Sequence, residues 1–133
     1  MHPKYKKADD YCSIVIGGAI EVHRLKGPGL IESIYEKCLM RELSLLGLSV
    51  KNQIQVPIEY KGYCFEEKLT LDVIVDDCLL LELKAVEHIL PVHKAQLLSY
   101  MKLLDIPIGL LLNFHELRMK DGIFRMILPN ANR

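Results

Sequence analysis

Two acidic residues and a lysine stand at spacings that suit metal-dependent hydrolysis. Glu82 and Lys84 follow an apolar run, 78–81, that is typical of a buried strand. Residues two apart on a strand point to the same face, so Glu82 and Lys84 project together. Asp72 lies ten residues before Glu82, in a second strand-like run, 69–75. Such a set can hold a divalent metal ion and orient a water for attack on phosphorus.

The same three residues also have a structural explanation. An ion pair between Glu82 and Lys84 at an exposed strand end, with Asp72 on a solvated rim, would need no metal. The apolar surroundings keep the metal-site hypothesis open, because charges in such places are costly unless they are paired or metal-bound. The two carboxylates face each other only if residue 75 pairs with residue 79 across a three-residue loop. At that separation they repel unless one is protonated or a cation lies between them.

Two more polar residues lie on helices next to this set. Glu32 falls in the first turn of a helix predicted over 30–46, where the helix N-terminus alone favours a carboxylate. A third acidic ligand, or a partner of metal-bound waters, is the other interpretation. Gln96 and Tyr100 form an i, i+4 pair on the helix predicted to begin at Pro91. That face either covers the site or is an ordinary solvated surface.

Hydrophobic periodicity predicts the element order ααβββαββ. The first helix is expected from a cap at Asp9 or Asp10 to the break at Gly27, and the second over 30–46. The third follows the Glu-x-Lys strand and begins at Pro91. The expected strands cover residues 50–60, 63–75, 79–85, 108–114 and 123–128.

Composition narrows the class of protein. The chain has 133 residues, 50% of them hydrophobic and 26% charged, so disorder is excluded and one domain over residues 1–133 is expected. Seventeen basic and seventeen acidic residues cancel, so nothing global favours a polyanion. No apolar run reaches about 18 residues and no signal peptide precedes the domain, which predicts a cytoplasmic protein without a membrane partner.

Cysteines and histidines do not suggest a site of their own. The four cysteines include no CxxC pair, so a zinc site is not expected. They are expected to be reduced core residues: Cys12, Cys38, Cys64 and Cys78. Three histidines without metal-ligand spacing are expected on the surface or in loops: His23, His88 and His115.

The heptad Gly29-x-x-Glu32-x-x-Tyr35 resembles the signature of the GxxExxY family, small proteins assigned to the PD-(D/E)xK nuclease superfamily. The resemblance covers about residues 10 to 128. Segments similar to the family in order are 27–36, 71–75, 81–86, 91–100, 109–114 and 120–125. It implies a restriction-endonuclease-like α/β (α+β) fold, with a central mixed β-sheet flanked by helices.

The resemblance also implies a site. A magnesium or manganese ion would be held by Asp72, Glu82 and the backbone carbonyl of Leu83, with Lys84 as the catalytic lysine. Glu32 and Gln96 match the family's positions on the flanking helices.

Two functions are compatible with these residues. The leading hypothesis is a metal-dependent nuclease that hydrolyses DNA or RNA by attack of a metal-activated water. The intact Asp72, Glu82 and Lys84 set favours it. The alternative is a non-catalytic nuclease-fold module that binds a protein or nucleic-acid partner, favoured by the neutral charge and small size. The small surface also predicts a homodimer or a targeting subunit, with Ile106–Phe114 as a dimer face.

Overall fold

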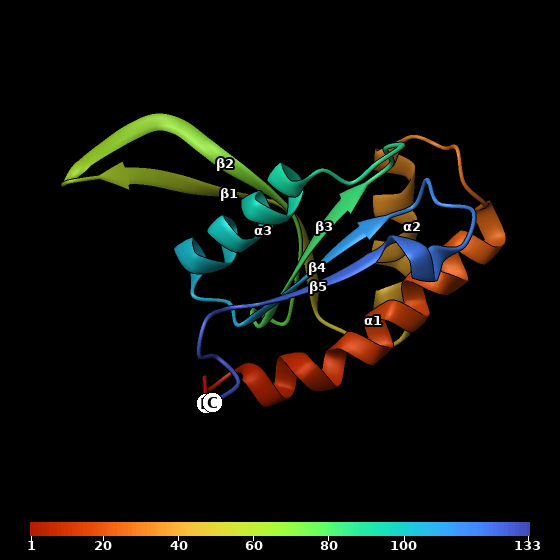
Figure 1. Cartoon of the computed structure of the whole chain (residues 1–133), viewed down its shortest axis with the longest axis horizontal. Coiled ribbons are helices and arrows are strands. Elements are labelled where there is room, and N and C mark those ends of the chain that lie inside the picture. The colour runs from red at the N-terminus through yellow and green to blue at the C-terminus, as the bar shows by residue number, and fades with distance from the viewer.

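Five strands form one mixed sheet, and three helices cover its two faces in an α+β arrangement (Figure 1). The computed structural model describes all residues, 1–133. The helices are α1 (Tyr5–Lys26), α2 (Glu32–Leu45) and α3 (Pro91–Leu104), with a 3-10 turn, η1 (Met119–Gly122). The strands are β1 (Val50–Tyr60), β2 (Tyr63–Val75), β3 (Leu79–Lys84), β4 (Ile108–Asn113) and β5 (Ile123–Ile127). The predicted element order is confirmed.

The strands lie in the sheet in chain order, β1-β2-β3-β4-β5. Only β3 and β4 pair in parallel, and the other neighbours are antiparallel. The parallel pair needs a crossover, which α3 supplies. Gly109 on β4 lets α3 approach closely, because a Cβ there would stand 2.7 Å from the Met101 sulfur.

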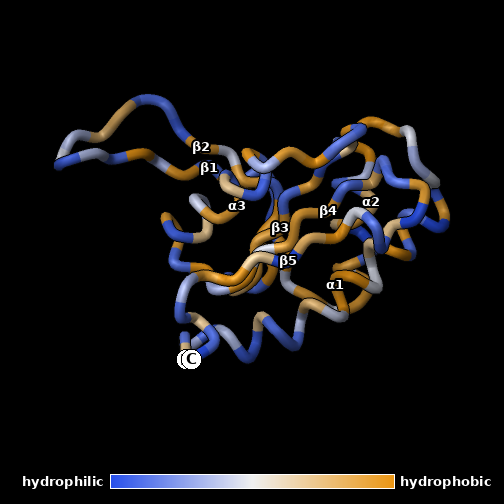
Figure 2. Tube along the Cα trace, viewed as in Figure 1, coloured by the Kyte–Doolittle hydropathy of each residue, from blue (hydrophilic) through white to orange (hydrophobic).

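The helices enclose two separate apolar clusters. α1 and α2 pack on one face of the sheet, and α3 packs on the other. Alternation along β3 sends Leu79, Leu81 and Leu83 to the α1–α2 side and Leu80 to the α3 side. In Figure 2 the central strands β3 and β4 are hydrophobic along most of their length. Glu82 therefore lies on the α3 side, with Leu80.

The first helix begins earlier than its expected cap. α1 starts at Tyr5, not after Asp9 or Asp10. Tyr5 packs against the large cluster and Ala8 is fully buried, so the apolar stripe extends one turn further toward the N-terminus. This packing compensates for the missing side-chain cap.

β1 and β2 project beyond the sheet as a two-stranded arm, residues 54–71 (Figure 1). β2 pairs with β3 only from Val73 to Val75, and residues 63–68 of β2 are exposed. β2 therefore separates from β3 at Asp72, whereas Leu71 is still fully buried in the cluster on the α3 side.

Three expectations about surfaces are wrong. Residues 106–114 are buried, because β4 is an inner strand between β3 and β5, so this segment offers no dimer face. Cys64 is not a core residue, since it lies exposed on the arm. His23 is buried on α1, where its Nε2 lies 2.8 Å from the backbone oxygen of Glu116.

No helix combines the length and apolarity needed to cross a lipid bilayer.

Candidate functional site

Asp72 and Glu82 meet where β2 separates from β3. The ladder ends at the Val73–Leu81 pair, and one further step in the same register brings Asp72 opposite Glu82. Side chains replace the ladder there: the Leu83 N–H donates to Asp72 Oδ2 at 2.8 Å, and the Asp72 N–H to Glu82 Oε1 at 3.5 Å. The predicted register and three-residue turn are confirmed by the Val75–Leu79 pair.

The two carboxyl groups are both withdrawn from solvent, but to different degrees. Glu82 is only 5% exposed, whereas Asp72 is half-buried. Burial, and next the negative charge of Asp72, raise the pKa of Glu82 to about 8. Burial also raises the pKa of Asp72, although the hydrogen bond from the Leu83 N–H opposes the shift. The pair thus retains a proton near neutral pH unless a cation neutralises it.

Lys84 lies beside the carboxyl groups without closing a salt bridge. The ion pairs of the chain do not include it, so the Glu82–Lys84 ion pair of the alternative structural explanation does not form. Burial raises the pKa of three neighbouring carboxyl groups, Glu32, Asp72 and Glu82, and the Lys84 ammonium opposes that shift in each. Lys84 is half-buried and remains free to meet another group.

α2 brings two glutamates to the site. Glu32 is the first residue of α2; burial raises its pKa, and the charge of Asp72 adds to the shift. Glu36, one turn later, is 8% exposed and accepts hydrogen bonds from Asn52 Nδ2 at 3.1 Å and Gln53 Nε2 at 2.7 Å. In the β1–β2 register Gln53 falls opposite Asp72, and it has a positive φ of 51°. Glu36 therefore fixes the base of the arm to α2.

Tyr35 holds the segment before α2 in place. Its hydroxyl donates to the Gly27 carbonyl at 2.6 Å and accepts from the Leu30 N–H at 3.0 Å. Its ring stacks on Phe114, with centroids 4.6 Å apart. Gly29 has a φ of 97°, which a side chain would disfavour. In Gly29-x-x-Glu32-x-x-Tyr35, the glycine and the tyrosine therefore position the glutamate.

α3 covers the site from the other face. Burial raises the pKa of Tyr100, and the charges of Glu82 and Asp72 raise it further. The Gln96 side chain opposes this shift. Gln96 is exposed and adjoins the site through Tyr100. The structure thus joins Asp72 and Glu82 and places Glu32 and Lys84 near them, whereas Gln96 is exposed on α3.

Two polar residues at the edges of the site were not predicted. His93 caps α3 in place of a Ser or Thr, since its Nδ1 accepts the Leu90 N–H at 3.0 Å. Asn113 is fully buried, and its amide bonds both the N–H and the carbonyl of Val86, at 3.1 and 2.9 Å. Asn113 thus holds in place the segment that follows Lys84. The only feature of the sequence that indicated this role is a polar residue at the end of an apolar strand.

The donor set fits a hard divalent cation. No group of three or more His, Cys, Asp or Glu side chains is arranged to hold a metal. Asp72 and Glu82 nevertheless offer carboxylate oxygens whose mutual repulsion a cation would relieve. The Leu83 N–H points to Asp72 on β2. Because the N–H and the carbonyl of a strand residue point toward the same neighbouring strand, the Leu83 carbonyl also points toward β2. Magnesium accepts such oxygen ligands and keeps several waters.

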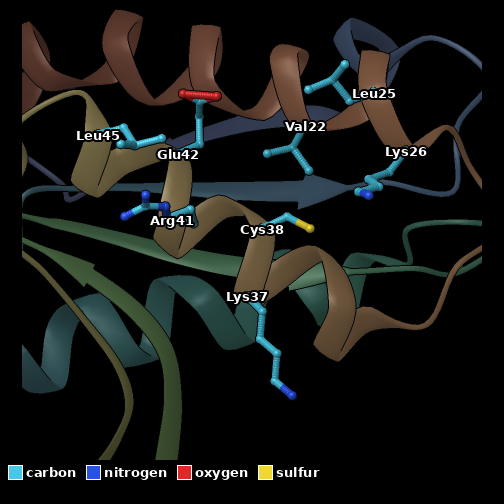
Figure 3. Close-up of a pocket in the computed structure, with 8 residues that line it drawn as sticks. All are labelled: Val22, Leu25, Lys26, Lys37, Cys38, Arg41, Glu42 and Leu45. Carbon is cyan, nitrogen blue, oxygen red and sulfur yellow. The ribbon is translucent and has the colours of Figure 1, made fainter.

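A surface groove lies elsewhere, between α1 and α2 (Figure 3). Its lining includes Val22, Leu25, Cys38 and three basic residues, Lys26, Lys37 and Arg41. The charged ends of these basic side chains point in different directions (Figure 3), so they do not converge on one anion. None of the candidate site residues lines this groove.

Comparison with known proteins identifies the family. No curated protein and no solved structure matches the chain. One family model, described as the PD-(D/E)XK nuclease superfamily, matches residues 9–126. The match spans α2, the paired carboxyl groups, Lys84 and α3, and the mixed sheet agrees with a restriction-endonuclease-like core. The narrower assignment to the GxxExxY family stays a prediction from the motif. The chain belongs to the PD-(D/E)XK nuclease superfamily.

Proposed function

We propose that this protein is a nuclease that hydrolyses phosphodiester bonds of DNA or RNA with the help of magnesium or manganese. The observation that carries the proposal is the pairing of the buried Glu82 with the half-buried Asp72, beside a lysine that closes no salt bridge. A purely structural role would favour a closed ion pair, because an unpaired buried charge is costly. Membership of a nuclease superfamily supports the same conclusion.

Each residue has a role in this proposal. Asp72, Glu82 and the Leu83 carbonyl would hold the metal ion, which would supply Lewis acidity and lower the pKa of a coordinated water. Lys84 orients the attacking water and offsets charge on the phosphate oxygens. Glu32 and Gln96 hold outer waters or the substrate from the two flanking helices.

The environment of Glu82 supports a metal-linked change of charge. The carboxyl group is protonated in the free site because burial and Asp72 raise its pKa to about 8. Binding of a divalent cation displaces that proton, since metal ligands must be deprotonated. Metal uptake by the wild type should therefore release protons at pH 7.

The test is cleavage of single- and double-stranded DNA and RNA with magnesium and then manganese. Lys84→Ala should slow cleavage by about a hundredfold or more, while metal binding persists. Lys102→Ala, an exposed lysine of α3, is the matched control and should cleave as the wild type does. If Lys84→Ala cleaves as fast as the wild type, the proposed role of Lys84 is wrong.

The alternative is a non-catalytic module of the same fold. If the wild type cleaves no substrate with either metal but binds one tightly, that alternative is correct. The free Lys84 and the buried carboxyl pair favour catalysis, because a binding module has no need of them.

A further inference from the structure

The arm carries the chain's exposed aromatic residues on one face. Tyr60, Tyr63 and Phe65 are 63%, 67% and 41% exposed. All other tyrosine and phenylalanine side chains are buried or half-buried. Tyr60 pairs directly with Tyr63, so both point to the same face, and Phe65 is two residues further along β2. The rings of Tyr63 and Phe65 meet edge to face, with centroids 5.2 Å apart.

This aromatic face (Tyr60, Tyr63 and Phe65) continues toward the candidate site. Alternation along β1 places Tyr60 on the same side as Ile54 and Val56, which pack against the α3 cluster. The aromatic face therefore lies on the α3 side of the sheet, the side of Tyr100 and Glu82. The strand that bears Phe65 leads, seven residues later, to Asp72. The distance is at most about 23 Å, because a register shift between Pro57 and Glu59 shortens β2 here.

The arm is poorly suited to extending the sheet. β1 is an edge strand, and Pro57 in its outer half has no N–H to donate to another strand. Gln53 further distorts the edge with its positive φ. Edge strands with such features resist pairing with a further strand. The exposed face, and not the edge, is the surface open to a partner.

The charged residues of the arm favour contacts with nucleotide bases over contacts with backbone phosphates. Residues 54–71 contain two lysines and three glutamates, so the arm has no basic stripe for a duplex backbone. Glu59 points away from the aromatic face and accepts the Gly62 N–H at 2.8 Å. Lys61 lies over the Tyr60 ring, 5.3 Å from its centroid, so one positive charge adjoins the aromatic face. Exposed rings beside a cation are the features that bind unpaired bases by stacking.

We propose that the arm binds unpaired nucleotides, stacks their bases on Tyr60, Tyr63 and Phe65, and leads that strand to the Asp72–Glu82 pair. Single-stranded nucleic acid is then the substrate class, an inference that rests on the proposed nuclease function. The distance from Phe65 to Asp72 corresponds to at most about seven stacked nucleotides. Strands much shorter than this cannot contact the aromatic face and the site together.

The test measures binding separately from cleavage. Fluorescence anisotropy in EDTA compares labelled oligo-dT and oligo-U of about twelve nucleotides with a duplex of the same length. The wild type should bind the single strands more tightly than the duplex. Tyr60→Ala, Tyr63→Ala and Phe65→Ala should each weaken binding about fivefold or more. Tyr63→Phe keeps the ring and should bind as the wild type does.

Leu117→Ala is the control for loss of exposed apolar surface, because Leu117 is 85% exposed and lies outside the arm. It should leave binding unchanged. Equal binding by the wild type and the triple alanine variant would overturn the inference, as would tighter binding of the duplex. The alternative is that the aromatic face binds a second copy of the chain, and light scattering tests this. A wild type that is dimeric and does not bind single strands, with a monomeric triple variant, would also overturn the inference.

Cleavage separates this inference from the proposed function. The triple variant should cleave strands of about twelve nucleotides more slowly than the wild type, and strands of about four nucleotides equally fast. Cleavage of both lengths at wild-type rates would overturn the role of the arm and leave the nuclease function standing. Arm-dependent binding without any cleavage would overturn the nuclease function and leave single-strand binding by the arm standing.

Discussion

Glu82 is 5% exposed and lies next to a second carboxyl group, and its chemistry follows from these two facts. A buried carboxylate loses hydration, and a like charge nearby adds repulsion, so the neutral form is favoured. Lys84 moderates this effect without cancelling it. The free site is therefore a destabilising feature at neutral and alkaline pH, which a bound cation relieves.

The stability of the metal-free protein should fall as the pH rises. Burial raises the pKa of Glu82 from 4.5 to about 8. The folded state then binds more protons than the unfolded state between these values, so the free energy of unfolding decreases from about pH 5 to pH 8. Glu82→Gln should reduce this dependence, because the amide does not titrate. Melting temperatures in EDTA across this range test the prediction.

Glu66→Gln provides the control for that experiment, because Glu66 is an exposed carboxylate on the arm. It should keep the wild-type pH dependence. A wild-type melting temperature that stays constant from pH 5 to 8, or one that Glu82→Gln leaves equally pH-dependent, would contradict the burial of a protonated Glu82.

Sequence reasoning identified the paired carboxyl groups because strand geometry is regular. The alternation of β3 and the length of the turn fix which side Glu82 faces and which residue it meets. The structural roles of Glu36 and Asn113 were not predicted, because their hydrogen-bond partners are distant in the chain. Nothing local in the sequence shows that Glu36 will meet Gln53, or that Asn113 will hold Val86.

Among the helices and strands, α2 and the segment before it depend on one hydroxyl. Tyr35 bonds to both Gly27 and Leu30 through that group, while its ring stacks on Phe114. The start of α2, and with it Glu32, is positioned by these contacts. The motif Gly29-x-x-Glu32-x-x-Tyr35 is thus explained by local structure.

Tyr35→Phe should destabilise the fold by about 1–2 kcal/mol, because it leaves the Leu30 N–H and the Gly27 carbonyl without their partner. The ring and its stacking on Phe114 remain. Chemical denaturation measures the change. Tyr63→Phe is the control, since the Tyr63 ring is exposed on the arm, and it should leave stability unchanged. Equal stability of Tyr35→Phe and the wild type would mean that the hydroxyl does not fix this segment.

Glu36 connects α2 to the base of the arm. Glu36→Ala removes the acceptor of two side-chain hydrogen bonds, from Asn52 and Gln53. Hydrogen bonds to a charged group contribute about 1.5–3 kcal/mol each, so a loss on the order of 3 kcal/mol is expected from chemical denaturation. Glu36→Gln retains one acceptor oxygen and should lose less. A loss below about 1 kcal/mol in Glu36→Ala would show that the tether contributes little.

The strands of the arm were predicted, but the arm itself was not. Residues 50–60 and 63–75 have the alternation and the turn of a hairpin, which the structure confirms. Alternation does not show how far a hairpin extends past its sheet. That depends on where β2 stops pairing with β3, and the Asp72 side chain determines this by taking the Leu83 N–H. The exposure of Cys64 follows from the same tertiary feature.

For the molecule as a whole, the element order and the mixed sheet followed from the sequence, and the superfamily match agrees with both. The prediction of a dimer face at residues 106–114 was wrong, because an apolar run is as typical of a buried strand as of an interface. Two layers of helices enclose the sheet, and the carboxyl pair lies where β2 separates from β3. The proposed activity depends on whether this pair holds a metal ion.

Calorimetric titration with magnesium and manganese, on the wild type and on Asp72→Asn, tests this claim most directly. Asp72→Asn keeps an oxygen for the Leu83 N–H but removes one of the two charges. The wild type should bind the metal and release protons at pH 7, whereas Asp72→Asn should show no binding. Asp10→Asn, an exposed carboxylate of α1, is the control and should bind as the wild type does. A wild type without heat of binding for either metal, or an Asp72→Asn variant that binds equally well, would contradict the account.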